Sequence, residues 1–339
     1  MKAIGYHHPY PIDHALALED LDLPAPQPGP RDLLVRVRAI AVNPVDTKVR
    51  ANAAPPENTA RVLGWDAVGM VEAVGSAVTN FKAGDRVYYA GALDRPGANS
   101  ELHLVDERIA ALAPASLDDA HAAAMPLTTI TAWELLFDRL GVTEGGGEGQ
   151  SILIIGGAGG VGSMLIQLAR KLTKLRVIAT ASRPETRQWC LDLGAHAVID
   201  HASAMAPQLG AVLNESAQGV DMVASLTNTD QHLADLVDCL LPQGRLALID
   251  DPRELDVKCL KQKSISLHWE LMFTRSMFQT ADMGEQGALL ARVAQLVDAG
   301  TLRSTLDAHY GAINVANLRR AHAMLESGKA RGKIVLEGF

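Results

Sequence analysis

Residues that build disulfides or thiolate metal sites are scarce in this chain. The 339 residues contain only three cysteines, Cys190, Cys239 and Cys259. An odd number of widely spaced thiols forms neither a disulfide framework nor a Cys-x-x-Cys metal site. The start, MKAIGY, also lacks the charged-then-apolar layout of a secretory signal. We therefore expect reduced thiols and a cytoplasmic location.

Long apolar runs and runs of basic residues are absent as well. No apolar stretch approaches the roughly 18 residues that a membrane helix needs. The formal net charge is −8, and no run of Lys or Arg reaches the roughly five residues typical of a nucleic-acid patch. Because an acidic chain repels phosphate backbones and anionic lipids, neither nucleic acid nor a membrane is an expected partner.

Two different patterns follow one another along the chain. The first third contains short β-type segments between Pro and Gly turns, with strands predicted at Leu33–Ile40, Val68–Val74 and Asp85–Tyr89. After Leu117, short apolar runs alternate with amphipathic helical patterns, which is typical of a parallel sheet covered on both faces. The apolar runs are Ile152–Ile155, Val177–Thr180, Ala197–Asp200, Val220–Ser225, Leu246–Ile249 and Ile265–Glu270.

This order of segments predicts the domain organisation. We expect an α/β fold in which residues 126–270 form a doubly wound parallel sheet of the Rossmann type. The flanking segments, residues 1–125 and 271–339, are expected to form one β-rich domain together.

A glycine-rich loop follows the first strand of the predicted parallel sheet. Gly157, Gly159 and Gly162 fit the pattern GxGxxG between an apolar strand and a helix. In such a loop, Gly157 would permit the tight turn, Gly159 the approach of a pyrophosphate, and Gly162 the close packing of helix on strand. The helix N-terminus supplies NH groups to phosphates. The predicted dinucleotide-binding residues are Gly157, Ala158, Gly159, Gly160, Val161 and Gly162.

The end of the next strand indicates which dinucleotide binds. NAD sites usually carry a carboxylate about 20 residues after the loop, yet here Ser182 and Arg183 follow the strand and no carboxylate precedes Glu185. A hydroxyl and a guanidinium bind a 2′-phosphate, which a carboxylate would repel. We predict NADP(H), with Arg187 and His201 assisting. The alternative, in which Arg183 only caps a solvated loop, stays open.

Several segments resemble the quinone oxidoreductase branch of the zinc-containing alcohol dehydrogenase family, which is also called the medium-chain dehydrogenase/reductase family. They are Val42–Asp46, Gly64–Gly75, Ala83–Val87, Pro126–Trp133, the glycine loop, Leu193–Ala195 with Ile199–Asp200, and Ala321–Leu336. The resemblance covers essentially the whole chain. It implies a GroES-like catalytic domain made from both chain ends, an inserted Rossmann domain and an active site in the cleft between them. It also implies a homodimer that pairs the strand Ile265–Glu270 with its symmetry mate.

The residues that would bind a catalytic zinc in metal-dependent members are missing. The matching positions are Asn43, Trp65 and about Leu127, and none of them offers a thiolate or an imidazole. The loop Gly91–Ser100, which corresponds to the structural zinc lobe, contains no cysteine. Nearby histidines do not suggest a replacement, because adjacent residues such as His7 and His8 point to opposite faces of a strand. We expect no metal.

A protein without a Lewis acid is poorly equipped to oxidise a simple alcohol. We therefore predict an NADPH-dependent oxidoreductase that transfers hydride to a small electrophilic acceptor, either a quinone or an α,β-unsaturated carbonyl compound. The resemblance suggests Asn43 as a hydrogen-bond donor to the substrate oxygen, Thr131 against the nicotinamide and Arg275 beside the cofactor.

Other assignments at the substrate side stay open. Asp46 and Asp66 are expected to bind loop NH groups rather than act as acids. The proton donor is water or a tyrosine such as Tyr88 or Tyr89. The tryptophans either wall an aromatic pocket or pack in the core; they are Trp65, Trp133 and Trp269.

Two competing functions are compatible with parts of the sequence. One is a zinc-dependent alcohol dehydrogenase. The other is a non-catalytic NADPH-binding protein, acting as a redox sensor or an RNA-binding protein, although the acidic charge argues against RNA. The sequence does not indicate the physiological acceptor.

Overall fold

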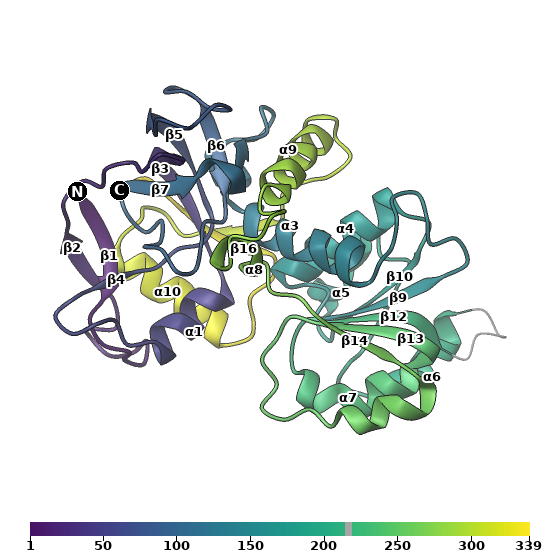
Figure 1. Cartoon of the computed structure of the whole chain (residues 1–339). Helices are drawn as coiled ribbons and strands as arrows, with labels where there is room; N and C mark the ends of the chain where they lie inside the picture. The colour runs from purple at the N-terminus through teal and green to yellow at the C-terminus, as the bar shows by residue number, and fades with distance from the viewer. Residues whose placement is uncertain (214–218) are drawn as a thin grey trace. The chain divides into compact units, whose positions relative to one another are not determined.

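The computed structural model describes residues 1–213 and 219–339, which form two compact units. The first unit combines Met1–Ile130 with Phe273–Phe339, and the second is Thr131–Met272. The two ends of the chain thus build one unit and the middle builds the other. Figure 1 shows the purple and blue N-terminal elements beside the yellow C-terminal ones within the first unit.

The first unit is organised around a mostly antiparallel sheet, in which only the pair β15–β16 is parallel. Its strands are β1 (Lys2–Tyr6), β2 (Glu19–Asp22), β3 (Asp32–Val42), β4 (Arg61–Val62), β5 (Ala67–Val74), β6 (Arg86–Tyr89), β7 (Leu102–Asp106), β8 (Ala110–Leu112), β15 (Leu306–His309) and β16 (Lys333–Glu337). Seven of them form the sheet β15-β16-β3-β5-β6-β8, in which β7 also pairs with β3, and the others form β2-β1-β4. The antiparallel pair β16–β3 joins the C-terminal segment to the N-terminal one.

Helices cover parts of this sheet. They are α1 (Pro44–Asn52), α2 (Asp119–Ala123), α3 (Pro126–Trp133), α8 (Thr274–Met277), α9 (Glu285–Asp298), α10 (Val315–Glu326) and the short η1 (Glu107–Ile109). The sequence pattern at Asn43–Pro44 suggests a turn, but α1 begins there with Asn43 as its N-cap. Pro44 is tolerated at the first helical position, where a missing NH loses no hydrogen bond. α1 packs against α10, so the two flanks of the chain also meet through helices.

The second unit has the predicted doubly wound architecture. Its strands are β9 (Ser151–Ile155), β10 (Arg176–Thr180), β11 (Ala197–Ile199), β12 (Val220–Ser225), β13 (Leu240–Leu248) and β14 (Ser266–Trp269). They are parallel and lie in the order β11-β10-β9-β12-β13-β14. This order is that of a Rossmann sheet, whose direction of winding reverses beside the first strand. All of β9 is buried, which explains its uninterrupted apolar sequence.

The helices of the second unit connect these strands. They are the π-helix η2 (Glu134–Arg139), α4 (Gly160–Leu172), α5 (Pro184–Asp192), α6 (Met205–Val212), α7 (Thr229–Cys239) and the 3-10 helix η3 (Val257–Lys263). The core lies between the sheet and these helices and contains mainly leucine, isoleucine and valine side chains. The boundaries between the two units lie inside α3 and after Met272, close to the boundaries that the sequence suggests.

Candidate active site

The glycine loop turns sharply directly after β9. The positive φ that the turn needs lies at Gly156, with φ 76°, and not at Gly157 as the sequence pattern suggested. Gly156 donates its NH to Thr180 Oγ1 over 3.0 Å, and Gly157 donates to Thr180 O over 3.1 Å. A Cβ on Gly157 would lie 2.8 Å from the Cβ of Ala179. Gly157 is therefore required for packing, and Gly156 makes the turn.

The other two glycines of the pattern occupy different surroundings. Gly162, in the first turn of α4, has no room for a Cβ, which would lie 2.5 Å from the carbonyl oxygen of Gly156. Its predicted role in close packing is confirmed. Gly159 is the N-cap of α4, and a Cβ there would meet nothing closer than 3.5 Å. Contacts within the protein therefore do not require glycine at position 159. A glycine here instead suits a loop that a ligand approaches closely.

This difference gives a testable pair of substitutions. We expect Gly162→Ala to lower the free energy of unfolding by about 1–3 kcal/mol, because the added methyl overpacks the loop. Gly159→Ala should leave the unfolding temperature close to that of the wild type but weaken NADPH binding by about tenfold, about 1.4 kcal/mol, through the methyl facing the pyrophosphate. Thermal unfolding and fluorescence titration with NADPH measure the two effects. Equal effects of both variants on stability would contradict this assignment.

The segments that follow β10 and β11 begin side by side, because these two parallel strands are neighbours in the sheet. Thr180 pairs with Ile199, so the segments carrying Ser182 and His201 leave the same edge of the sheet. Ser182 is exposed, and Arg183 is the N-cap of α5 with its Nε 3.2 Å from Glu185. Because both members of this ion pair are substantially exposed, the pair contributes little, and a phosphate can compete for the guanidinium.

Arg187 and His201 have partners that refine their expected roles. Arg187 donates to the carbonyl oxygens of Ala181, over 3.2 Å, and Val198, over 2.7 Å, and so ties the ends of β10 and β11 together. Burial lowers the pKa of His201, and the neighbouring His232 lowers it further. His201 is therefore neutral at pH 7, so it can offer a phosphate a hydrogen bond but not a positive charge.

Sequence reasoning missed a set of polar residues beside the glycine loop. Ser225 ends β12, the strand next to β9, and its hydroxyl lies 2.7 Å from Thr229 Oγ1. Asp250 accepts hydrogen bonds from the NH and hydroxyl of Thr229 over 2.8 and 2.6 Å. A Cβ on Gly156 would lie 3.1 Å from the Thr227 side chain. These residues border the point where the strand order reverses, which is where dinucleotides bind; only the strand order identifies them.

A buried polar network joins the three segments that carry the positions matched to zinc ligands in metal-dependent members. Asp66 is 0% exposed, and its Oδ2 accepts hydrogen bonds from Asn43 Nδ2 and Lys333 Nζ, both over 2.8 Å. Its Oδ1 accepts from the NH of Leu127 over 2.7 Å. Asp46 accepts from the NH groups of Asn43 and Gly64 over 2.7 and 3.0 Å. The prediction of bound loop NH groups is confirmed for Asp46, whereas the NH that binds Asp66 belongs to the first turn of α3.

Lys333 supplies the positive charge of this network. The side chain is 3% exposed and donates to Asp66, to the Val42 carbonyl over 3.2 Å and to Asn43 Oδ1. These acceptors use all three hydrogens of the ammonium group. Burial raises the pKa of Asp66 while Lys333 lowers it, and burial raises the pKa of Asp46 to about 7. A lysine at the start of a terminal strand gives no sequence signal for this role.

The expected role of Asn43 needs correction. Asn43 is 1% exposed, and its amide NH₂ donates to Asp66 and, over 3.3 Å, to the Ala41 carbonyl. Both amide hydrogens therefore have protein acceptors, and neither remains for a substrate oxygen. Asn43 connects Lys333 and Asp66 instead.

Comparison with known proteins places this geometry in a family. Residues 193–336 match the zinc-binding dehydrogenase family, and residues 29–113 match the alcohol dehydrogenase GroES-like domain. A zinc-type alcohol dehydrogenase-like protein of Staphylococcus epidermidis is 37% identical over 339 residues, which cover 99% of each chain. The chain belongs to the medium-chain dehydrogenase/reductase family. The first unit is its GroES-like domain and the second its Rossmann domain.

Relatives of this oxidoreductase include quinone oxidoreductases. One from Pseudomonas aeruginosa is 33% identical over 94% of this chain and 95% of its own. The solved Escherichia coli quinone oxidoreductase in complex with NADPH has a TM-score of 0.82 at 25% identity, covering 99% of this chain and 100% of the other. A structure from Rhizobium etli, described as a zinc-dependent alcohol dehydrogenase, has a TM-score of 0.95 and 53% identity, with 100% and 98% coverage.

The residues of this family member do not fit the zinc that the family description implies. Trp65 is 1% exposed, donates to the Ala92 carbonyl over 3.0 Å and contacts Phe273 edge-on. Leu127 contributes its backbone NH, and the Lys333 ammonium already neutralises Asp66. In residues 1–213 and 219–339, no group of three or more His, Cys, Asp or Glu side chains is placed to hold a metal ion.

The tyrosines considered as proton donors lie in the core of the GroES-like domain. Tyr88 and Tyr89 are both 0% exposed, and burial raises the pKa of each. Tyr88 donates to the Leu290 carbonyl over 2.6 Å, and the Tyr89 hydroxyl lies 3.1 Å from His103 Nδ1. Their hydroxyl groups therefore stabilise the fold and are not available to an acceptor.

The remaining predicted residues lie in different elements. Arg275 is in α8, with its Nε 3.0 Å from Asp282. Thr131 lies in α3 and is 5% exposed. Trp133 contacts Phe137 in η2, whereas Trp269 is 51% exposed on β14.

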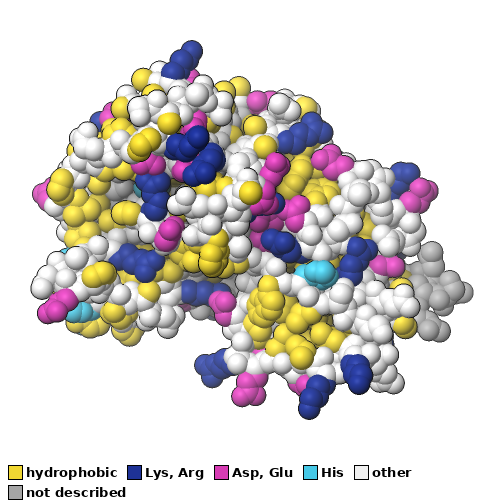
Figure 2. All heavy atoms as spheres, in the orientation of Figure 1, with side chains coloured by type: hydrophobic (Ala, Val, Ile, Leu, Met, Phe, Trp, Pro, Cys, Tyr) yellow, Lys and Arg dark blue, Asp and Glu magenta, His cyan; other side chains and the backbone are white. Residues whose placement is uncertain are grey.

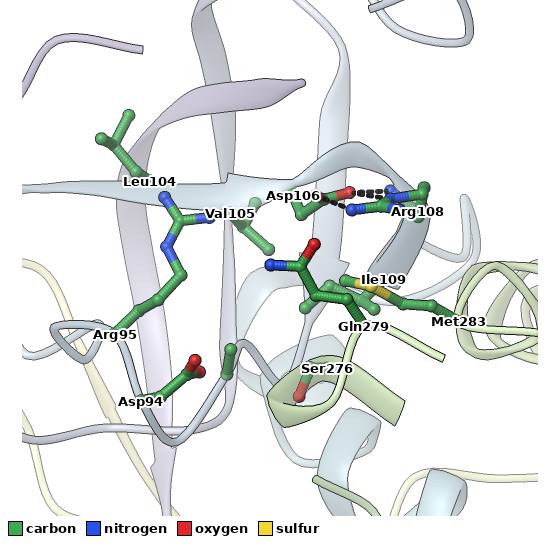
Figure 3. A pocket seen from close by; sticks show the side chains of 11 residues that line it. Asp94, Arg95, Leu104, Val105, Asp106, Arg108, Ile109, Ser276, Gln279 and Met283 are labelled. Atoms are coloured by element: carbon green, nitrogen blue, oxygen red, sulfur yellow. Dashed lines mark hydrogen bonds and ion pairs between the residues drawn. The ribbon is translucent and has the colours of Figure 1, made fainter. Parts of the chain in front are cut away.

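A small pocket in the GroES-like domain lies beside β7, η1 and α8. Its volume of about 50 Å³ holds one or two water molecules but no aromatic acceptor. Figure 3 shows Arg108 joined to Asp106, and Arg95 is paired with Asp32 over 2.8 Å. The pocket therefore offers no uncompensated cation for an anionic ligand, and we assign it no role.

The charged side chains of the surface are of both signs. On the face shown in Figure 2, Lys and Arg side chains are interspersed with Asp and Glu and form no continuous basic stripe. Within the two described ranges, no helix has both the length and the apolar composition required to span a bilayer.

Proposed function

We propose that this family member is an NADPH-dependent reductase that transfers hydride to a quinone or an α,β-unsaturated carbonyl compound without a catalytic metal. The observation that carries the proposal is the buried network of Asn43, Asp66 and Lys333. An internal ammonium compensates the carboxylate at the positions matched to metal ligands, so no Lewis acid is held there. Reduction of an electron-poor acceptor needs the least activation under these conditions.

NADPH as the dinucleotide is supported by the end of β10. Ser182 and Arg183 offer a hydroxyl and a guanidinium, and Glu185 is the first carboxylate after the strand. His201 lies on the segment after the adjacent strand and adds a neutral hydrogen-bonding group. Bound NADPH supplies the hydride. We propose that Thr131 packs against the nicotinamide and that Arg275 lies beside the cofactor, with Asp282 fixing its guanidinium.

An acceptor screen tests the proposed reaction. Oxidation of NADPH and NADH is followed in parallel with quinones, enones, aldehydes and ketones, using protein purified without added zinc. We expect turnover with quinones or enones, a preference for NADPH and no effect of chelators. Stoichiometric zinc together with chelator-sensitive alcohol oxidation would favour a zinc-dependent alcohol dehydrogenase. NADPH binding without turnover of any acceptor would favour the non-catalytic sensor.

We also propose a homodimer formed through β14, the edge strand of the Rossmann sheet. The NH of Glu270 donates to the Leu248 carbonyl over 2.9 Å, so alternation along the strand directs the NH of Trp269 to the open edge. An unpaired strand edge with an exposed tryptophan is suited to pairing with a second copy.

Trp269→Pro tests this pairing. The proline lacks the NH that points to the open edge, but the hydrogen bonds between β14 and β13 stay intact. The protein should therefore remain folded and lose its dimer. Trp269→Ala keeps the NH and is the matched control. Sedimentation velocity measures the mass of each variant. A Trp269→Pro protein with the same assembly state as the wild type would argue against pairing through β14.

A further inference from the structure

A histidine is buried without hydrogen bonds in the GroES-like domain. His322 lies in α10 and is 0% exposed. Neither its Nδ1 nor its Nε2 has a hydrogen-bond partner among the described residues. A neutral imidazole has one donor and one acceptor nitrogen, and leaving both unpaired in the interior costs free energy. Hydrogen bonding within the fold therefore does not account for a histidine at this position.

A buried arginine lies beside this histidine. α10 packs against α1, as Figure 1 also shows, and Arg50 of α1 is 1% exposed. Its terminal nitrogens donate to Glu326 Oε1 and to the Tyr10 carbonyl, whereas its Nε has no partner in the described part of the chain. Glu326 follows His322 by four residues, so the two side chains lie one turn apart on the same face of α10. The guanidinium that binds Glu326 therefore lies close to the His322 ring.

The same two helices hold a segment near the N-terminus. Arg50 of α1 donates to the carbonyl oxygen of Tyr10. Arg319 of α10 donates to three further carbonyl oxygens over 3.1 to 3.4 Å, which belong to Ile12, Asp13 and Ala15. The segment Tyr10–Ala15 thus bridges α1 and α10 through backbone carbonyl groups. These bonds all persist only while the two helices stay side by side.

A proton on His322 would place a second positive charge beside Arg50, away from water. The carboxylate of Glu326 is already bound to Arg50, and a buried charge without a partner is strongly unfavourable. In agreement, burial lowers the pKa of His322 to about 3, with the charge of Arg50 as the second cause. The other titratable side chains on α10 and on the elements packed against it have partners of their own or are exposed; they are Arg319 and Arg320 on α10, Asp46 and Lys48 on α1, Asp32, Arg36 and Arg38 on β3, Lys333 and Glu337 on β16, and Tyr10, Asp13 and His14 in the bridging segment.

We propose that the α1–α10 interface is an acid-sensitive joint, in which a proton on His322 separates the two helices where they meet and releases the segment Tyr10–Ala15. In the separated form the ring is in water and binds a proton near pH 6.5, roughly its ordinary pKa. The neutral ring therefore favours the packed helices fully above that pH, and this contribution is lost as the pH falls toward 3. Because the packed form excludes the proton, acidification from pH 8 to pH 5 favours separation by about 30-fold. Neither the dinucleotide nor the acceptor takes part.

Hydrogen exchange of the full chain, measured by mass spectrometry at pH 8 and pH 5, tests the joint. His322→Leu removes the titrating ring and its two unpartnered nitrogens but keeps a side chain of similar volume. After correction for intrinsic exchange rates, the opening constant of α10 in the wild type, divided by that in His322→Leu, should be about 30-fold larger at pH 5 than at pH 8. The titration of other groups, Asp46 among them, cancels in this ratio. His309→Leu removes an exposed histidine of the same domain and is the matched control, which should behave as the wild type.

Two further readouts distinguish the joint from a packing role. Proteolysis after Asp13, an exposed residue held through its carbonyl oxygen, should accelerate at pH 5 in the wild type but not in His322→Leu. His322→Asn, which also lacks a titrating ring, replaces the leucine variant if that variant does not fold. An opening ratio that is the same at both pH values would overturn the inference, because His322 would then only fill space. A rise of equal size in peptides of the Rossmann sheet would also overturn it, because it would indicate global unfolding rather than separation of α10 from α1.

Discussion

Lys333→Met is expected to lower the free energy of unfolding by about 3–5 kcal/mol, because it leaves the buried Asp66 carboxylate without its cation. Lys333 is 3% exposed and donates to both Asp66 and Asn43, so a methionine of similar length fills the space but compensates no charge. Urea unfolding at pH 7 measures the loss. The effect should shrink toward acid pH. Burial raises the folded pKa of Asp66 even in the wild type, although Lys333 lowers it, and the loss of the ammonium raises it further. Protonation of Asp66 therefore stabilises the folded variant at low pH, and this contribution is lost as the pH rises.

The control for this prediction is Lys329→Met, which removes an exposed lysine four residues earlier and should change stability by less than about 0.5 kcal/mol. Combining Lys333→Met with Asp66→Asn removes both charges and should recover part of the loss. If the Lys333→Met protein is as stable as the Lys329→Met protein, the Lys333 ammonium does not compensate the charge of Asp66. The double variant also separates the effect of the lost charge from that of lost packing, because it contains the same methionine as the Lys333→Met variant.

The cofactor preference should respond strongly to Ser182 and Arg183. Arg183→Ala is expected to raise the KM for NADPH by about 10–10²-fold, the equivalent of one lost charge-assisted hydrogen bond, and to leave the KM for NADH nearly unchanged. Adding Ser182→Asp places a carboxylate at the end of β10, where it accepts from ribose hydroxyls and repels a 2′-phosphate. The double variant should therefore prefer NADH. Initial rates with both dinucleotides and one fixed acceptor measure the ratio of kcat/KM.

Arg253→Ala is a suitable control, because Arg253 is an exposed arginine in the same domain and far along the chain from β10. It should change neither KM. If the wild type prefers NADH, or if Arg183→Ala affects both dinucleotides equally, the proposed 2′-phosphate site is wrong. In that case Arg183 only caps a solvated loop, with its guanidinium paired to Glu185.

The Rossmann domain could be predicted closely because its signals are local. Its buried strands are short apolar runs, and the glycine spacing follows directly after the first of them. The predictions were wrong in details that depend on the backbone conformation of single residues. The positive φ lies at Gly156, one residue before the glycine expected to make the turn. Asn43–Pro44 starts α1, because capping residues and turn residues are the same amino acids.

The sequence alone determined the family, the α/β architecture, the glycine loop and the absence of zinc ligands at the matched positions, since each depends on residue types at short, fixed spacings. Only the tertiary structure decided what Asn43 does and that Arg139 binds Glu270. Lys333 reaches Asn43 across 290 positions of sequence, and Arg139 reaches Glu270 across 131. Such contacts leave no periodic trace in a single chain, because charges are paired by folding and not by their spacing.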